Sequence, residues 1–198
     1  MIVNVAIFVS GNGSNCEEII KYFNNSKTVK IALVLSSKQD AYALVRAKKY
    51  NVPTVVVNKN NFNSKDYLLN ILHGFHIDFI VLAGFLLMVP EFLINIYPSK
   101  IINLHPALLP KFGGKGMYGH HVHEAVKNAG EEISGFTVHF VSTVCDGGEI
   151  IKQHSFKIER DDSASDIAEK EHLLELEYFP CIIESVINSI FKDNYTND

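Results

Sequence analysis

Residues 3–15, VNVAIFVSGNGSN, decide the fold class of this chain. The first eight of them are mostly apolar, which predicts a short strand that is buried on both faces of a sheet. A turn rich in glycine and asparagine follows at residues 11–15, and the helix after it carries Ile19, Ile20 and Phe23 on one side. A buried strand, a glycine turn and an amphipathic helix in this order are typical of α/β proteins.

The same alternation of strand and helix continues through the first half of the chain. Apolar runs predict further strands at residues 29–36, 54–57, 79–83 and 101–105. Asp40 is expected to cap a helix over residues 41–50, which Asn51 ends. Ser64 is expected to cap a second helix, which runs through Leu72. We therefore expect a mainly parallel sheet with helices on both faces, and ligands of such sheets bind beyond the carboxyl ends of the strands.

The second half of the chain predicts an antiparallel extension of this sheet. Two apolar stretches, residues 133–141 and 149–158, can pair around the turn Asp-Gly-Gly at residues 146–148. A glycine-rich loop over residues 112–119 precedes them and leads into a helix near residues 122–128. The parallel alternation of the first half is therefore not expected to continue here.

The C-terminal region is expected to be helical, beginning at Ser163 or Ser165. Pro180 should break or kink this helix, because proline has no N–H group for the hydrogen-bond ladder. No linker divides the chain, so we expect one domain over residues 1–192 and a frayed tail over residues 193–198. The expected fold is a single α/β domain with a mainly parallel, Rossmann-like central sheet, helices on both faces and an antiparallel extension in the C-terminal half.

Composition and charge narrow the expected partners and location. The 198 residues are 47% hydrophobic and carry a net charge of -4, which favours neither a nucleic acid nor an anionic membrane surface. A small anionic substrate is still possible, because one local site can oppose the overall sign. Three cysteines without metal or redox spacing, no basic leader and no apolar run of about 18 residues predict a soluble, cytoplasmic protein.

The turn at residues 11–15, GNGSN, is a candidate phosphate site. Free N–H groups and the positive end of the helix attract an anion there, and glycine lets the backbone approach it closely. The alternative is a tight turn that only needs a positive φ. A dinucleotide is disfavoured, because Cys16 replaces the third glycine of the motif and Ser36 and Ser37 stand where an acidic residue would bind a ribose.

Two further stretches carry candidate catalytic residues. Alternation along the strand places Asn103 and His105 on one face, just before Pro106 ends it, where an amide and an imidazole could stabilise an oxyanion. The alternative is a pair of hydrogen-bonded polar residues at a strand end. In the second stretch, Thr137 and His139 share a face, and Asp146 begins a Gly-Gly turn in which a solvated aspartate is ordinary.

Taken together, these stretches resemble those of the glycinamide ribonucleotide formyltransferases. The matching segments are GNGSN, IVLAGF at residues 80–85, NLHPALLPKF at residues 103–112, and GFTVHFV at residues 135–141 with DGG five residues on. They occur in the family's order and at its spacing, and the resemblance spans about residues 2–182.

The resemblance implies a role for particular residues. Asn103, His105 and Asp146 would be catalytic. The residues implied for the substrate are Gly13, Ser14 and Asn15 at the phosphate and Glu175 at the ribose, with Glu177 as the competing alignment. Those implied for the folate are Lys65, Leu86, Leu87, Met88, Val89, Asn103, Val141 and Asp146. Better-known members have arginine where this chain has Lys65 and Leu87, and a shorter loop at residues 113–119, so the folate contacts are expected to differ.

The activity implied by the resemblance is formyl transfer from 10-formyltetrahydrofolate to the amine of glycinamide ribonucleotide, in de novo purine biosynthesis. Folate would be a cosubstrate, no metal is expected, and the protein would be a monomer or homodimer. Asn103 and a protonated His105 would stabilise the oxyanion, while Asp146 holds His105 and helps to move the amine proton.

Several alternatives share parts of this pattern. A methionyl-tRNA formyltransferase would need an RNA-binding domain, for which the length and charge leave no room. A formyltetrahydrofolate hydrolase usually has an additional N-terminal domain, whereas the first expected strand begins at residue 3. A non-catalytic nucleotide-binding regulator is the alternative from another class. His120, His121 and His123 invite a metal interpretation, but loop or substrate contacts are favoured, and Lys111 could contact a phosphate.

Overall fold

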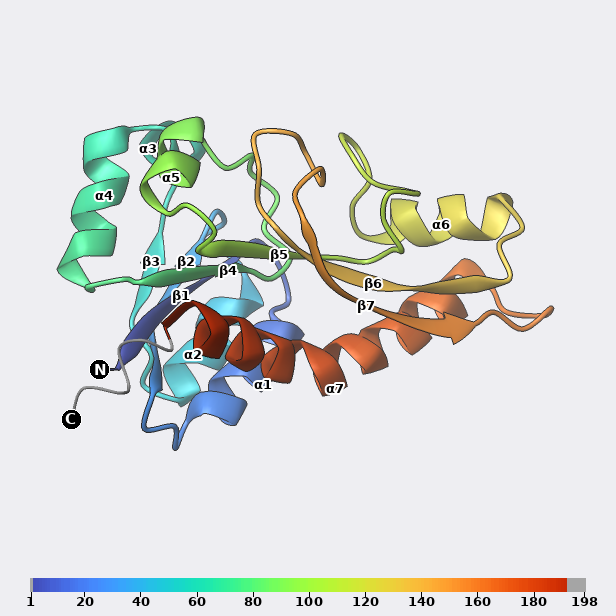
Figure 1. The fold of residues 1–198 in the computed structure, drawn as a ribbon, viewed down its shortest axis with the longest axis horizontal. Coiled ribbons are helices and arrows are strands. Elements are labelled where there is room, and N and C mark those ends of the chain that lie inside the picture. Colours follow the sequence, from blue (N-terminus) through green and yellow to red (C-terminus); the bar gives the residue numbers. More distant parts are fainter. Residues whose placement is uncertain (1, 192–198) are drawn as a thin grey trace.

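The structure is a computed structural model that describes residues 2–191. Within these residues, seven strands form one sheet in the order β3-β2-β1-β4-β5-β6-β7 (Figure 1). The strands are β1 (Val3–Val9), β2 (Val29–Ser36), β3 (Thr54–Val56), β4 (Phe79–Leu82), β5 (Ile101–His105), β6 (Ile133–Phe140) and β7 (Ile150–Lys157). The first five run parallel, and β6 and β7 extend the sheet in antiparallel fashion. The predicted mainly parallel sheet and its C-terminal antiparallel extension are both confirmed.

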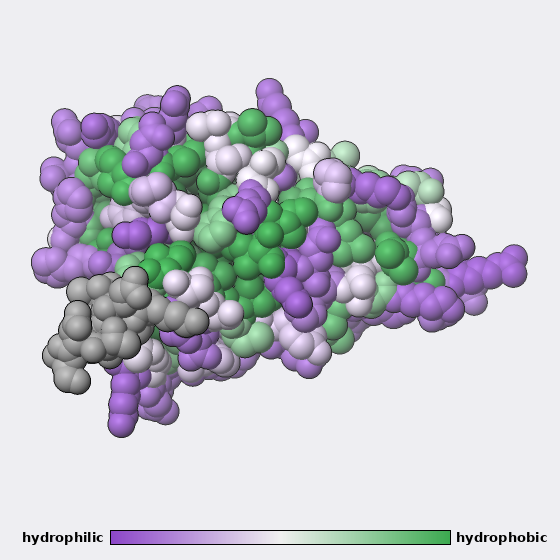
Figure 2. Space-filling model, in the orientation of Figure 1, coloured by the Kyte–Doolittle hydropathy of each residue, from purple (hydrophilic) through white to green (hydrophobic). Residues whose placement is uncertain are grey.

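Helices cover both faces of the sheet, as the alternation predicts. They are α1 (Ser14–Phe23), α2 (Tyr42–Lys49), α3 (Lys59–Phe62), α4 (Lys65–Gly74), α5 (Glu91–Ile96), α6 (His120–Asn128) and α7 (Ala164–Phe191). In Figure 1, α1, α2 and α7 lie on one side of the sheet, and α3, α4 and α5 lie on the other. In the same view, hydrophilic residues gather towards the outer ends of the molecule and hydrophobic residues over its middle (Figure 2).

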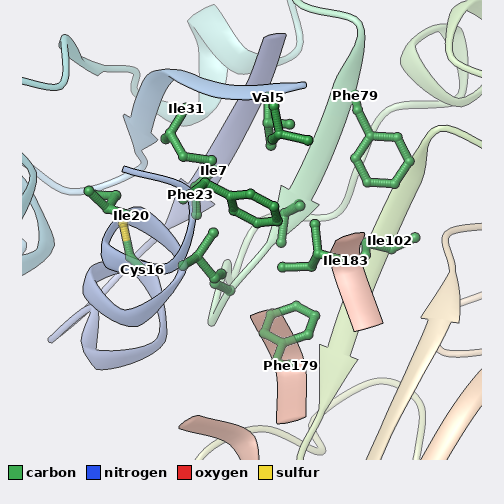
Figure 3. Packing of buried hydrophobic residues seen from close by; sticks show 14 of the residues in the cluster. Val5, Ile7, Cys16, Ile20, Phe23, Ile31, Phe79, Ile102, Phe179 and Ile183 are labelled. Carbon is green, nitrogen blue, oxygen red and sulfur yellow. The ribbon is translucent and has the colours of Figure 1, made fainter. Parts of the chain in front are cut away.

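Two main hydrophobic cores therefore form, one on each face, and β1 contributes to both, while a smaller third cluster lies between α6 and the start of α7. Val5 and Ile7 pack into the core beneath α1 and α7, where Figure 3 shows them close to Phe23 and Phe179. The residue between them, Ala6, lies in the other core. This alternation explains why nearly the whole strand is apolar, since both of its faces are buried.

The starts of two helices differ from the prediction. Asp40 does not cap α2, because the helix begins at Tyr42 and Ala41 occupies the capping position. Asp40 is thus one residue too early for its side chain to reach the first free N–H groups of the helix. Ser64 does hold the capping position of α4, but its side chain makes no capping hydrogen bond.

The C-terminal helix α7 is continuous through Pro180, so of the predicted break or kink the break is wrong. Pro180 lies inside the helix and is buried, next to Phe179 and close to Ile183 of the first core. The packing of these neighbours outweighs the local cost of one missing hydrogen bond. Of the two proposed starting residues it is Ser163 that opens the helix, through reciprocal hydrogen bonds with Asp166.

Two short helices, α3 and α5, were not expected from the sequence, because neither is long enough to show a helical period. The expected tail at residues 193–198 lies outside the described residues. Among the residues that the structure describes, no helix has the length and apolar composition needed to cross a membrane.

Candidate active site

A cavity of about 660 Å³ opens at the carboxyl ends of β1, β4 and β5. Its walls come from the turn after β1, the segment after β4, the end of β5, the glycine-rich loop before α6, the turn after β6, and the first half of α7. The order of the strands reverses between β1 and β4, which is where an open α/β sheet binds its ligand.

The turn after β1 is held in place by close packing against α2. Gly13 has a φ of 75°, and a Cβ atom there would lie 2.3 Å from Cβ of Ala43. The N–H of Ala43 also donates to the carbonyl of Gly11 at 3.2 Å. No side chain caps α1, so the N–H groups at its start are left for a ligand, and Ser14 and Asn15 line the cavity with Gly13.

Asn15 connects this turn to α7. Its Nδ2 donates to Oε2 of Glu175 at 2.7 Å, and Nδ1 of His172 lies 3.0 Å from the same oxygen. Glu175 is buried and lines the cavity, whereas Glu177 is exposed and does not. The structure thus brings Glu175, and not the competing Glu177, to the cavity wall beside the turn after β1.

The three candidate catalytic residues lie together in the middle of the cavity. Asn103 and His105 come from β5, and Asp146 approaches them from the turn after β6. Nδ1 of His105 lies 3.5 Å from Oδ2 of Asp146, which also accepts from the N–H of Gly114 at 2.9 Å. The turn and the glycine-rich loop therefore meet at this carboxylate.

His139 joins the group, and the sequence analysis did not include it among the site residues. The pairing of β5 with β6 places it directly opposite Asn103. Its Nε2 lies 3.1 Å from Nδ2 of Asn103 and 3.6 Å from Oδ1 of Asp146, while Nδ1 lies 2.8 Å from the carbonyl of Phe140. A neutral ring with its proton on Nδ1 donates to that carbonyl and accepts from the Asn103 amide, which fixes the amide orientation. The sequence contained one indication of this role, namely that residues 137 and 139 share one face of the strand.

Burial sets the protonation of His105. It lowers the pKa of this histidine below the usual value, and the opposing effect of the Asp146 carboxylate does not overcome it. Nε2 of His105 lies 2.8 Å from the carbonyl of Phe112, which places the single proton of the neutral ring on that nitrogen. The expected protonated form is therefore not the one that the ligand-free site favours at neutral pH.

Asp146 is stabilised as the carboxylate. Burial alone would raise its pKa, but the neighbouring His139, the hydrogen bond from the N–H of Gly114 and the neighbouring His105 lower it below the usual value. An ionised Asp146 can therefore stabilise a positive charge that develops on His105.

The segment after β4 forms an apolar wall of the cavity. Leu86, Leu87, Met88 and Val89 all line it, and Leu86 and Met88 are exposed at 49% and 59%. Val141 lies on the cavity wall as well. Lys65 is exposed at the start of α4 and does not line the cavity, so the structure does not bring it together with the other expected folate residues.

The histidines at the start of α6 do not form a metal site. His120 and His121 lie 3.4 and 3.7 Å from oxygens of Glu124 at the surface, whereas His123 is buried on the cavity wall. Among residues 2–191, no three His, Cys, Asp or Glu side chains are placed to hold a metal ion. Lys111 pairs with Glu131 at 2.8 Å and is not on the cavity wall.

Comparison with known proteins agrees with this geometry. Residues 3–183 match the family model described as formyl transferase, and the chain belongs to that family. Within it, the chain is 35% identical to the chloroplastic phosphoribosylglycinamide formyltransferase of Arabidopsis thaliana, over 92% of this chain and 66% of that protein. It is also 35% identical to the phosphoribosylglycinamide formyltransferase of Haemophilus influenzae, over 91% of this chain and 85% of that protein.

Solved structures of the same name share the fold. The phosphoribosylglycinamide formyltransferase of Anaplasma phagocytophilum superposes with a TM-score of 0.84 at 33% identity, covering 92% of this chain and 86% of that one. The enzyme of Streptococcus pneumoniae superposes with a TM-score of 0.80 at 34% identity, covering 96% and 99%.

Proposed function

We propose that this chain transfers the formyl group of 10-formyltetrahydrofolate to the amine of glycinamide ribonucleotide, a step of purine biosynthesis. The observation that carries the proposal is the meeting of Asn103, His105 and Asp146 in one cavity, between a phosphate-type turn and an apolar wall. Relatives that bear the name of this activity match most of the chain.

The two ends of the cavity suit the two substrates. The N–H groups at the start of α1, with Gly13, Ser14 and Asn15, would hold the phosphate of the ribonucleotide, and Glu175 would accept from its ribose. The folate would pack against Leu86–Val89 and Val141, where exposed apolar side chains suit a flat ring system. Neither role requires a metal ion.

The reaction would begin when the neutral amine of the ribonucleotide attacks the formyl carbon and forms a tetrahedral intermediate. One N–H of the Asn103 amide is directed to His139, so the other is free to donate to the developing oxyanion. His105, neutral in the free protein, would accept the amine proton, directly or through water, while Asp146 stabilises the resulting imidazolium. Breaking the bond from the formyl carbon to the folate nitrogen, and returning the proton to that nitrogen, completes the transfer.

The test is to mix the protein with glycinamide ribonucleotide and 10-formyltetrahydrofolate and to measure both the deformylated folate and the mass of the formylated product. Equal amounts of the two products support the proposal. Release of formate without the ribonucleotide would instead show a hydrolase, and binding without turnover would show a regulator.

We also propose that the protein acts in the cytoplasm as a monomer or homodimer. All three cysteines are free, which suits a reducing compartment, although the Arabidopsis relative is chloroplastic. Sedimentation of the purified protein measures the oligomeric state directly.

A further inference from the structure

Two glutamates one helical turn apart on α7 face the substrate end of the cavity. Glu171 is 2% exposed and Glu175 is 6% exposed, and both line the cavity wall. Their spacing of four residues places both side chains on the same side of the helix, next to each other. A role for Glu175 follows from the proposed function, but Glu171 has none there.

The surroundings of Glu171 favour its protonated form. Burial, followed by the charge and the hydrogen bond of Glu175, raises the pKa of Glu171 well above its usual value. A neutral Glu171 has an O–H group that can donate to Glu175, which also accepts from Asn15 and lies against His172. With Glu171 neutral, Glu171 and Glu175 together carry one negative charge fewer than they would if both were ionised.

The surroundings of the pair contain few positive charges. The other ionisable groups on the cavity wall near this end are His172 on α7, His120 and His123 on α6, His105 on β5, and Lys115 on the glycine-rich loop. Burial lowers the pKa of both His105 and His123, so neither is a strong source of positive charge at neutral pH. A second ionised carboxylate would thus repel a phosphate at the neighbouring turn with little compensation.

Three buried atoms at this end have no hydrogen-bond partner among the described residues. They are Oε1 of Glu171, Oδ1 of Asn15 and Nδ1 of His123, and all three residues line the cavity. The two oxygens are acceptors, so each needs a donor from a ligand or a water molecule. A sugar with neighbouring hydroxyl groups supplies such donors.

We propose that Glu171 is a second ribose-binding residue, which works with Glu175 to recognise both hydroxyl groups of the substrate's sugar. This inference rests on the proposed function, because it assumes that a ribonucleotide occupies this end. The neutral acid contributes a hydrogen-bonding oxygen without adding negative charge beside the phosphate. If both hydroxyl groups are bound in this way, the protein should bind ribose in preference to sugars that lack one hydroxyl group.

The test is a cycle between protein and substrate variants. Glu171→Leu and Glu171→Gln are compared with the wild type on glycinamide ribonucleotide and on its 2′-deoxy and 3′-deoxy analogues. Glu177→Gln is the matched control, since Glu177 lies on the same helix but is exposed and away from the cavity. Thermal melts of each variant separate binding from folding.

We expect Glu171→Leu to raise KM for the ribonucleotide roughly three- to tenfold, the effect of losing one hydrogen bond, and to leave KM for the folate within about twofold. With the wild type, one of the two deoxy analogues should have a KM raised by a similar factor over that of the ribonucleotide. With Glu171→Leu, the same analogue should raise KM little further, since the same contact is already lost. Glu171→Gln should recover part of the loss, because an amide keeps one acceptor and one donor.

A pH profile provides a readout that a purely structural role would not move. As the pH rises through the raised pKa of Glu171, wild-type KM for the ribonucleotide should rise relative to that of Glu171→Gln, because only the wild type gains a second negative charge there. Titration of the substrate affects both proteins equally and cancels in the ratio.

The outcomes distinguish the two proposals. If the wild type fails to formylate the ribonucleotide at all, the proposed function is wrong. The wild type can also turn over normally while both deoxy analogues raise the KM of Glu171→Leu by the same factor as that of the wild type; the role of Glu171 is then wrong. It is also wrong if the ratio of the wild-type KM to that of Glu171→Gln does not change with pH.

Discussion

At the residue scale, the proposed chemistry depends on a few side chains whose hydrogen bonds are shared. His139 orients the amide of Asn103, and Asp146 lies between His105 and His139. Because each group positions or charges another, the effects of their removal should not be independent.

This coupling leads to a prediction for the catalytic group. Asn103→Ala and His105→Ala should each lower kcat by about 100- to 1,000-fold or more, the usual effect of removing an oxyanion donor or a general base. The double variant His105→Ala/Asp146→Ala should lose far less than the product of the two single losses. Asp146→Asn should also lower the pKa of His105, because the neighbouring negative charge disappears.

Single-turnover kinetics at saturating substrates measure the rates, and NMR titration measures the histidine pKa. Thermal melts close to that of the wild type would show that folding is intact. Strictly multiplicative losses would argue against the coupling of Asp146 with His105.

At the element scale, the phosphate-type turn connects β1 with α1 and packs against α2, and the contact of these three elements is called the joint below. Gly13 is the point of closest approach, and its positive φ and the contact with Ala43 both exclude a side chain. The position of the N–H groups at the start of α1 depends on this joint.

Gly13→Ala should therefore lower the free energy of unfolding by about 1–3 kcal/mol, from backbone strain and overpacking against Ala43. It should also raise KM for the ribonucleotide more than KM for the folate. Gly11→Ala is the matched control for stability, because a Cβ atom at Gly11 meets nothing within 4 Å. Chemical denaturation measures both variants, and equal destabilisation by the two would contradict the proposed role of the joint.

The packing of β7 on α7 predicts a dependence of stability on pH. His154 is stacked between Phe136 at 5.4 Å and Tyr178 at 4.1 Å, and burial, followed by the charge of Lys152, lowers its pKa. The unfolded chain then binds more protons at this residue than the folded one. The contribution of His154 to the free energy of unfolding therefore decreases as the pH falls below about 6.5. Between pH 7 and pH 5, the wild type should lose more stability than His154→Phe.

Urea denaturation at a series of pH values measures this difference. His73→Phe, which removes an exposed histidine at the end of α4, is the matched control. Parallel pH profiles for the wild type and His154→Phe would show that stacking of the neutral ring does not contribute.

At the scale of the whole molecule, segments from the entire chain meet at one edge of the sheet. The turn after β1, the end of β5 and α7 are far apart in sequence, as the colours of Figure 1 show, but residues from all three line one cavity. The order of the strands causes this, because it opens a crevice between β1 and β4 that the later segments close.

We expect the complete cavity to require a phosphorylated substrate. Glycinamide riboside, which lacks the phosphate, should lose at least about 100-fold in kcat/KM, since two hydrogen bonds to a charged group contribute about 1.5–3 kcal/mol each. Steady-state kinetics with both substrates measure the ratio. Comparable values for the riboside and the ribonucleotide would mean that the turn after β1 has another role.

The sequence by itself determined the strands, most of the helices and the segments of the site. Apolar runs and helical periods are local properties, so they can be recognised in the sequence without knowledge of the fold. The expected Asn103, His105 and Asp146 do lie together, because Asn103 and His105 share β5 and the turn after the antiparallel β6 brings Asp146 to His105.

Only the tertiary structure decided which glutamate faces the cavity, which histidine accompanies Asn103, and that His105 is favoured as the neutral ring. The pairing of β5 with β6 brings His139 to Asn103, and the packing of α7 on α1 brings Glu175 to Asn15 and Glu171 to the cavity wall. The same packing keeps α7 continuous through Pro180 against its local preference. These contacts join residues distant in sequence, and their energies depend on burial, which local patterns do not contain.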